Sequence, residues 1–134
     1  MNAASLETGK HLSISLLLLR LGVAAVMIPW SLDKVLNPDH AAGVFENFYF
    51  ISGLGPAAFA TIGVVQLLVV LAFIAGFQKV WTYGAVLIMH AISTFSSWQQ
   101  YLDGNLLFFA AWPMLAACVA LFLLRDQDNL FAVS

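Results

Sequence analysis

Four long apolar segments, separated by short polar stretches, dominate the pattern of this 134-residue chain. They cover residues 12–32, 56–77, 80–98 and 106–124, and each approaches the roughly 20 residues that a helix needs to cross a bilayer. Backbone amides inside lipid have no water to bond with, so these segments are expected to be helices. Short connections after the second and third segments predict antiparallel neighbours. We therefore expect one membrane domain over residues 1–134, an all-α antiparallel bundle of four transmembrane helices.

The connection after the first segment is long enough to hold a further helix. Asn37 suits the capping position and Pro38 the first helical position. Apolar residues then recur at helical spacing, namely Ala41, Val44, Phe45, Phe48 and Tyr49. This pattern predicts a short amphipathic helix that lies along the membrane surface or covers one end of the bundle.

Composition supports a membrane protein and excludes several classes of function. Hydrophobic residues make up 62% of the chain and charged residues only 9%, whereas soluble domains average about 25% charged residues. Membrane lipid is therefore an expected partner. The net charge of -2 and the lack of a basic patch argue against nucleic acid. Cys118 is the single cysteine, so an intrachain disulfide is excluded.

The positions of the basic residues predict the orientation of the bundle. Lys10, Lys79 and Arg125 fall on one side of the four segments, and Lys34 alone falls on the other. Loops that face the cytoplasm carry an excess of Lys and Arg. We therefore expect both termini in the cytoplasm and an integral protein of the bacterial cytoplasmic (inner) membrane.

Arg20 is the one charged residue well inside an apolar segment. A charge at this depth costs at least ~2.5 kcal/mol on insertion scales, so its side chain needs a partner. All seven acids lie outside the four segments: Glu7, Asp33, Asp39, Glu46, Asp103, Asp126 and Asp128. Three alternatives follow: Arg20 is satisfied by polar groups of its own bundle, by an acid of another chain, or by a bound ligand with carbonyl or anionic oxygens, such as a quinone or a lipid.

Two other segments carry polar side chains at a similar depth. Gln66 lies midway along the second segment and His90 midway along the third, on the same helical face as Tyr83. Arg20, Gln66, Tyr83 and His90 together form a candidate ligand site near the midplane. His90 is either a hydrogen-bonded structural residue or a proton carrier. It is the only central histidine, so no metal site and no cofactor held by this chain itself are expected.

A second group of polar and aromatic residues gathers at the predicted outer rim: Trp30, Asp33, Lys34, Asp39, His40, Trp98 and Asp103. Tryptophan at this level is typical of a membrane-interface anchor. Asp33 and Lys34 are expected to neutralise one another or to cap the helix end. The alternative is a docking surface for a further protein subunit outside the cytoplasm.

The stretch "LLRLGVAAVMIPWSLDKVLNP", residues 18–38, resembles the signature of the DoxX family. An Arg-Leu pair is followed by a small residue, an aromatic residue and a Lys-hydrophobic pair before a proline. The turn "FIAGFQKVW" is similar too, and the resemblance covers roughly residues 16–124. It implies a four-helix membrane protein linked to quinone-dependent redox or sulfur chemistry, like the DoxD/DoxX-like small subunit of thiosulfate:quinone oxidoreductase. The family's Arg and Lys match Arg20 and Lys34, but Gln66 stands where many members have glutamate, which puts a proton-coupled role of that pair in doubt.

Two functions follow from these patterns. In the first, the chain is a redox-associated membrane subunit that binds a quinone-like molecule and receives electrons from a partner, since it has no electron carrier of its own. In the second, it is a non-catalytic structural or accessory subunit of a larger membrane complex. A small transporter is a weaker third, because the chain shows no inverted repeat. Catalysis by this chain alone is not expected.

Overall fold

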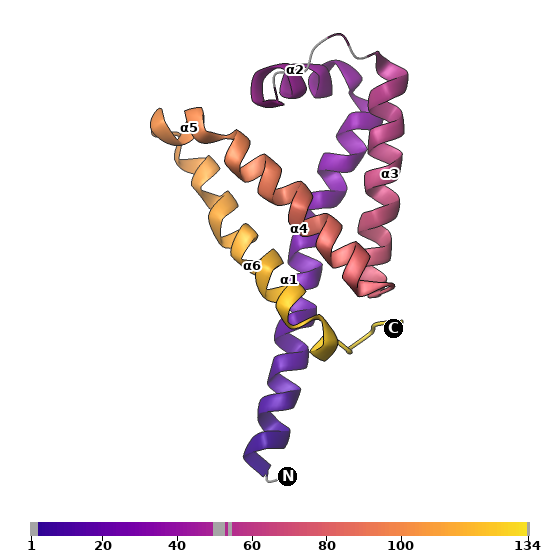
Figure 1. The fold of residues 1–134 in the computed structure, drawn as a ribbon, viewed down its shortest axis with the longest axis vertical. Helices are drawn as coiled ribbons and strands as arrows, with labels where there is room; N and C mark the ends of the chain where they lie inside the picture. Colours follow the sequence, from indigo (N-terminus) through magenta and orange to yellow (C-terminus); the bar gives the residue numbers. More distant parts are fainter. Residues whose placement is uncertain (1–2, 50–52, 54, 134) are drawn as a thin grey trace.

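The computed structural model describes residues 3–49, 53 and 55–133, and all regular structure within them is helical. Four helices are long: α1 (Ala3–Leu36), α3 (Pro56–Ala75), α4 (Lys79–Ser96) and α6 (Ala111–Leu123). The short elements are α2 (Pro38–Tyr49), α5 (Trp98–Leu102), and the 3₁₀ turns η1 (Leu106–Ala110) and η2 (Arg125–Gln127). The long helices alternate in direction, so the two ends of the described chain lie toward the same end of the molecule (Figure 1).

Three helices are long and apolar enough to cross a membrane, over Leu6–Leu36, Ala57–Ala75 and Leu106–Leu123. Helix α4 is not among them, because Lys79 and a stripe of hydroxyl, phenol and imidazole side chains make it more polar. Large apolar side chains on the long helices point outward, with Leu68 62% and Leu123 70% exposed. A soluble monomer rarely exposes so much apolar surface, whereas lipid covers it without cost. These features are those of an all-α membrane protein.

The helix boundaries differ from those of each of the four predicted segments, and α3 ends at Ala75 rather than at residue 77. Helix α1 begins well before residue 12, and its polar N-terminal part projects beyond the bundle (Figure 1). The predicted segment 80–98 is interrupted at Ser97, where α4 ends and α5 begins. The predicted segment 106–124 consists of η1 followed by α6. These differences affect the ends of the elements and leave the order of the four long helices as predicted.

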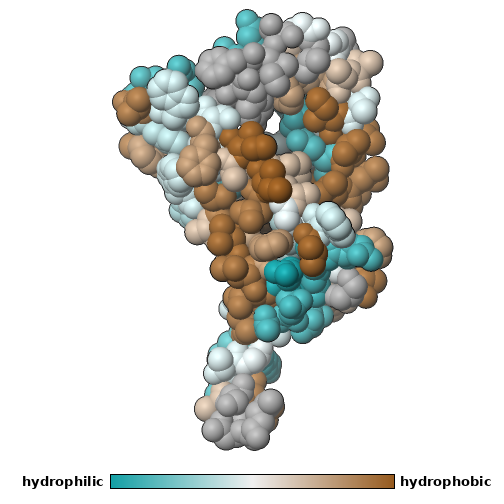
Figure 2. All heavy atoms as spheres, in the orientation of Figure 1, coloured by the Kyte–Doolittle hydropathy of each residue, from teal (hydrophilic) through white to brown (hydrophobic). Residues whose placement is uncertain are grey.

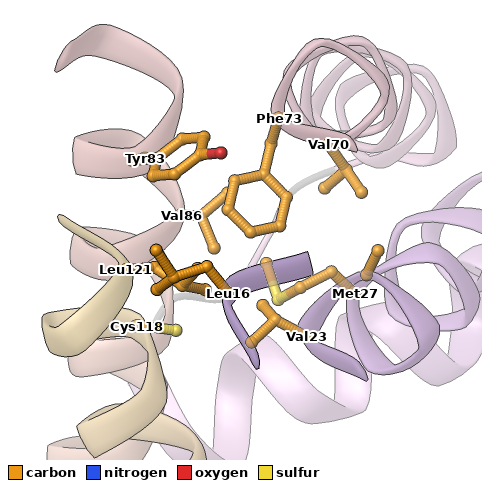
Figure 3. Close-up of a cluster of buried hydrophobic side chains, with 10 residues drawn as sticks. Leu16, Val23, Met27, Val70, Phe73, Tyr83, Val86, Cys118 and Leu121 are labelled. Carbon is orange, nitrogen blue, oxygen red and sulfur yellow. The ribbon is translucent and has the colours of Figure 1, made fainter. Parts of the chain in front are cut away.

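The core lies where the four long helices converge. Figure 3 shows side chains from all four helices meeting in it, including Leu16 and Val23 of α1, Val70 and Phe73 of α3, Val86 of α4, and Cys118 and Leu121 of α6. Helices α1 and α3 approach closely at Gly63. A Cβ atom at this position would lie 2.8 Å from the carbonyl oxygen of Ser31. Glycine therefore allows the two backbones to pack directly against one another.

Helix α2 is the predicted helix of the long connection, and it covers one end of the bundle (Figure 1). Its Ala41 and Phe45 are buried against Phe59 of α3, and the Phe45 and Phe59 rings meet edge to face with centroids 5.1 Å apart. The side chains of Phe48 and Tyr49, which were predicted to share this face, lie outside the described part of the structure. The buried positions confirm the apolar face as far as it is described.

The four long helices form two pairs, α1 with α3 and α4 with α6. The pairs lie close together near the start of α4 and diverge toward the end that α2 covers (Figure 1). This divergence separates the bundle into a tightly packed end, which holds the C-terminal segment, and an open end beneath α2. Arg20 lies at the packed end, and a cavity lies at the open end.

Candidate functional site

The side chain of Arg20 is fully buried, and its partners come from α4 and from the segment after α6. Its Nη1 lies 3.4 Å from Oδ1 of Asp128 and donates to the Tyr83 hydroxyl at 3.3 Å. Its Nη2 donates to the backbone carbonyl of Leu130 at 2.5 Å and to that of Phe131 at 3.4 Å. Arg20 is thus paired with an acid of its own chain.

Asp128 is as deeply buried as Arg20 and is held by two further donors. The Tyr83 hydroxyl donates to its Oδ2 at 2.5 Å, and Nζ of Lys79 donates to its backbone carbonyl at 2.6 Å. A buried ion pair is stable only when hydrogen bonds satisfy the remaining polar atoms. Here Tyr83 bonds to both charged groups, so it fixes their relative positions. The cluster Arg20, Tyr83, Lys79 and Asp128 joins α1 and α4 to the C-terminal segment at the packed end of the bundle.

The C-terminal segment folds back across the bundle end to bring Asp128 to Arg20. Its Val133 donates its backbone N–H to the carbonyl of Ala75, the last residue of α3, at 2.8 Å. It passes directly over Gly76, which has a left-handed φ of 69°. A Cβ atom on Gly76 would lie 2.6 Å from Cβ of Ala132 and 3.1 Å from Nη1 of Arg20. Glycine is therefore required here both by backbone conformation and by space.

Asp128 is the functional partner that sequence reasoning missed. It was set aside with the other acids because it lies outside the apolar segments. One signal was present: Asp128 follows the last apolar segment, on the same side as the beginning of the first. A short tail at that side can turn back toward Arg20, but the apolar pattern does not show that it does so.

A cavity of about 540 Å³ lies at the opposite, open end of the bundle. Most of its wall is apolar, and its polar lining residues are Ser31, Asp33, Lys34, His40, Gln66, Ser93 and Ser97. In Figure 2 the surface is hollowed near the upper end, with hydrophilic residues visible between hydrophobic ones. The volume and the few polar groups in an apolar wall are typical of small-molecule sites. This cavity is the stronger candidate for a ligand site.

The structure divides the predicted ligand site between the two ends. Arg20 and Tyr83 lie together in the packed end, whereas Gln66 lines the open cavity. Gln66 makes no hydrogen bond within the described part of the chain. No contact joins Arg20 to Gln66 or His90 among the described residues, because α3 and α4 place those two side chains nearer the open end.

His90 is buried between α4 and α6 beside the cavity wall. Its Nε2 lies 3.0 Å from the carbonyl oxygen of Ala111, and Trp30 packs against its ring with centroids 6.1 Å apart. The carbonyl requires a hydrogen on Nε2, and Nδ1 is buried without a partner in the described structure. No three His, Cys, Asp or Glu side chains of the described residues group as metal ligands. The observed contacts of His90 link three helices, α4 with α6 and with α1.

The residues of the predicted outer rim also fall into two groups, one in the cavity wall and one outside it. Trp30, Asp33, Lys34 and His40 line the cavity, whereas Asp39, Trp98 and Asp103 are exposed and lie outside its wall. Asp33 Oδ2 lies 2.5 Å from Nδ1 of His40, and Lys34 donates to the carbonyl of Trp30 at 3.3 Å. Asp33 and Lys34, which were expected to neutralise one another or to cap the helix end, form no ion pair at contact distance, because consecutive residues of a helix do not face each other. The charge of Asp33 still acts on Lys34.

Comparison of the chain with models of known protein families, with curated proteins and with solved structures finds no match.

Proposed function

We propose that this chain is a small DoxX-like subunit of the bacterial cytoplasmic membrane that binds a quinone or a lipid in its outer cavity. In this proposal it acts with a partner protein in quinone-linked redox or sulfur metabolism and is not catalytic alone. The observation that carries the proposal is the 540 Å³ cavity beneath α2, with Gln66 unpaired in its wall. The resemblance of residues 18–38 to the DoxX signature supplies the redox context.

The chemistry of the cavity suits an amphipathic molecule. Met27, Met89 and Phe45 supply apolar wall, and methionine adapts to ligands of irregular shape. Gln66 can donate to a ligand oxygen or accept from a ligand hydroxyl. A quinone or a lipid has both the apolar body and the few polar atoms that such a site recognises.

The contacts of Arg20 favour this location over the predicted midplane site. Its two Nη atoms already bond Asp128, Tyr83 and two carbonyls, so a ligand oxygen at either atom would have to displace protein groups. Its Nε has no partner among the described residues but is buried. We therefore place the ligand in the outer cavity, where Gln66 and Lys34 can form further hydrogen bonds. Asp39, Trp98 and Asp103, exposed beside this end, offer a docking surface for the partner that supplies electrons.

The proposal includes four membrane crossings, with α4 as the third of them and both termini in the cytoplasm. The stripe of polar residues on α4 faces the bundle, with Thr82, Tyr83, His90 and Thr94 all buried. The outward residues of α4 are apolar, including Ile88 at 60% and Ile92 at 53% exposure. A helix with this distribution is compatible with lipid on its outer face despite its polar composition.

Native mass spectrometry of the full chain in nanodiscs tests whether the cavity holds a ligand. Ile92→Trp places a large side chain at the cavity wall, and Ile88→Trp one turn earlier on α4 is the matched control, because Ile88 is similarly exposed but does not line the cavity. We expect a copurifying quinone or lipid in the wild type and in Ile88→Trp. Its occupancy should fall several-fold in Ile92→Trp.

A chain that copurifies with no such molecule, or whose bound molecule is unaffected by Ile92→Trp, would contradict the proposal. The second candidate function, a non-catalytic accessory subunit, is favoured by the internal ion pair and hydrogen bonds of the two Nη atoms of Arg20. It predicts a copurifying partner protein without any ligand in the cavity.

A further inference from the structure

We infer that Lys34 selects the head group of the bound molecule, and that this molecule is an amphiphile with an anionic oxygen head on an apolar chain. The inference rests on the proposed function, since it assumes that the outer cavity is a ligand site. It goes further by assigning the charge of the ligand, its orientation and the residue that recognises it.

The hydrogen bonds around the cavity leave few groups available to a ligand. The hydroxyls of Ser31 and Ser97 donate to the carbonyls of Met27 and Ser93 in their own helices, at 2.9 and 3.0 Å. Their hydrogens are therefore already used. Gln66 has no hydrogen-bonding partner among the described residues, and Lys34 donates one hydrogen bond there. The donors that remain for a ligand are the amide of Gln66 and the ammonium of Lys34, and Lys34 alone among them carries a positive charge that suits an anionic oxygen.

The carboxylate of Asp33 forms no ion pair at contact distance with Lys34 and attracts its charge only from farther away. Its Oδ2 contacts His40 at 2.5 Å, and its Oδ1 accepts from Nδ2 of Asn37 at 3.3 Å. Both oxygens are thus directed toward the beginning of α2. No salt bridge of Lys34 occurs within the described residues.

The ammonium of Lys34 therefore has hydrogens to donate, and no carboxylate of the described residues is in direct contact with its charge. It carries three N–H donors, and the carbonyl of Trp30, at 3.3 Å, accepts one of them. Its side chain is half-buried against the cavity. A cation partly withdrawn from water binds an anionic oxygen more strongly than a neutral one. These features make Lys34 the contact for a charged head group.

The positions of the lining residues along the helices orient the ligand. Lys34 lies near the end of α1, and Met27 lies seven residues earlier, about 10 Å deeper at 1.5 Å per residue. Gln66 lies one turn beyond Gly63, the residue that packs against Lys34, so it occupies an intermediate depth. The head group is therefore at the mouth, a second polar atom is near Gln66, and the apolar chain is on the floor.

The diverging helix pairs give such a molecule a route from the surrounding lipid. Ile92 lines the cavity and is 53% exposed, so the cavity is open beside it. With lipid around α4, as proposed above, an apolar chain would enter there sideways without crossing water. A lipid of the outer leaflet has its head at the membrane surface and its chain inside, which is the orientation that Lys34 and Met27 require.

Two sources share this chemistry, the phosphate of a phospholipid and the carboxylate of a fatty acid. The test uses the full chain in phosphatidylcholine nanodiscs, with phosphatidylglycerol, oleate or a short-chain neutral quinone added as the probe. The variants are Lys34→Gln, the charge-conserving Lys34→Arg, and Lys10→Gln as control, because Lys10 is exposed on the same helix far from the cavity. Bound probe is counted by native mass spectrometry, and thermal unfolding confirms that each variant is folded.

We expect an anionic probe to bind the wild type, Lys34→Arg and Lys10→Gln, and to lose about tenfold in affinity in Lys34→Gln, as for loss of one charge-assisted hydrogen bond. Enrichment of phosphatidylglycerol alone assigns the phosphate, and enrichment of oleate alone assigns the carboxylate. If the neutral quinone binds and the Lys34 variants bind all probes equally, the inference is wrong while the proposed function stands. If no probe binds the wild type, the proposed function fails as well.

Discussion

The guanidinium of Arg20 and the carboxylate of Asp128 lie 3.4 Å apart in the packed end of the bundle, although one belongs to the first helix and the other follows the last. Both side chains are fully buried. The pair closes the chain on itself, because the C-terminal segment that carries Asp128 also covers Gly76 and bonds to the end of α3. Arg20 can be satisfied only after α6 has packed and this segment has docked.

Removal of the charge on Asp128 should destabilise the protein strongly. Asp128→Asn leaves Arg20 buried without a counter-ion, and breaking a buried pair in this way costs about 3–5 kcal/mol. We expect a clear fall in the midpoint of thermal unfolding in mild detergent. Asp126→Asn is the matched control, because Asp126 is exposed two residues earlier, and its midpoint should stay near that of the wild type.

The double variant Arg20→Leu/Asp128→Leu, together with the two single variants, measures the interaction between the two side chains. It removes both charges together, so its destabilisation should be smaller than the sum of the two single changes. Additive effects in this double-mutant cycle would show that the two side chains do not interact, against the geometry described above.

Gly76→Ala should destabilise the docked C-terminal segment. A left-handed φ of 69° costs a non-glycine residue about 1–2 kcal/mol, and the new Cβ atom would also collide with Ala132. Gly104→Ala is the control for the backbone term alone, because Gly104 has a φ of 74° with nothing within 4 Å of its Cβ position. We expect limited proteolysis to cut the C-terminal segment faster in Gly76→Ala than in Gly104→Ala. Equal rates would argue against contact between this segment and Gly76.

Gly63→Ala should loosen the packing of α1 on α3. Its Cβ atom would lie 2.8 Å from the carbonyl oxygen of Ser31, and overpacking of this kind typically costs about 1–3 kcal/mol. Gly22→Ala provides the comparison, because nothing lies within 4 Å of its Cβ position and alanine favours the helix by about 0.5–1 kcal/mol. Unfolding midpoints should therefore move in opposite directions for the two variants. A neutral Gly63→Ala would contradict the close approach of these helices.

Cysteine labelling with a membrane-impermeant maleimide should report four crossings. Native Cys118 is 2% exposed and should react little, so single cysteines can be added to the natural chain. We expect Asp39→Cys and Asp103→Cys to react in intact cells, and Lys10→Cys and Asp126→Cys to react only after permeabilisation. Reaction of Asp103→Cys and Lys10→Cys from the same side would exclude α4 as a membrane crossing.

The sequence by itself determined the order of the long helices and the amphipathic character of α2. Apolar runs must form helices wherever lipid leaves the backbone no other partner, and the spacing of Ala41 and Phe45 identifies the buried face of α2. Three long apolar helices agree with this expectation, and the polar stripe of α4 was likewise expected to turn inward.

Only the tertiary structure decided which polar residues meet. The apolar pattern places Arg20 and Gln66 at a similar depth in the membrane. Because the helix pairs diverge, Arg20 lies in the packed end beside Asp128, whereas Gln66 lines the open cavity. Asp128 reaches Arg20 through a tail whose path is set by Gly76, Lys79 and Tyr83 together. Periodicity describes the faces of single helices, whereas the pairing of distant charges depends on how all the helices pack around them.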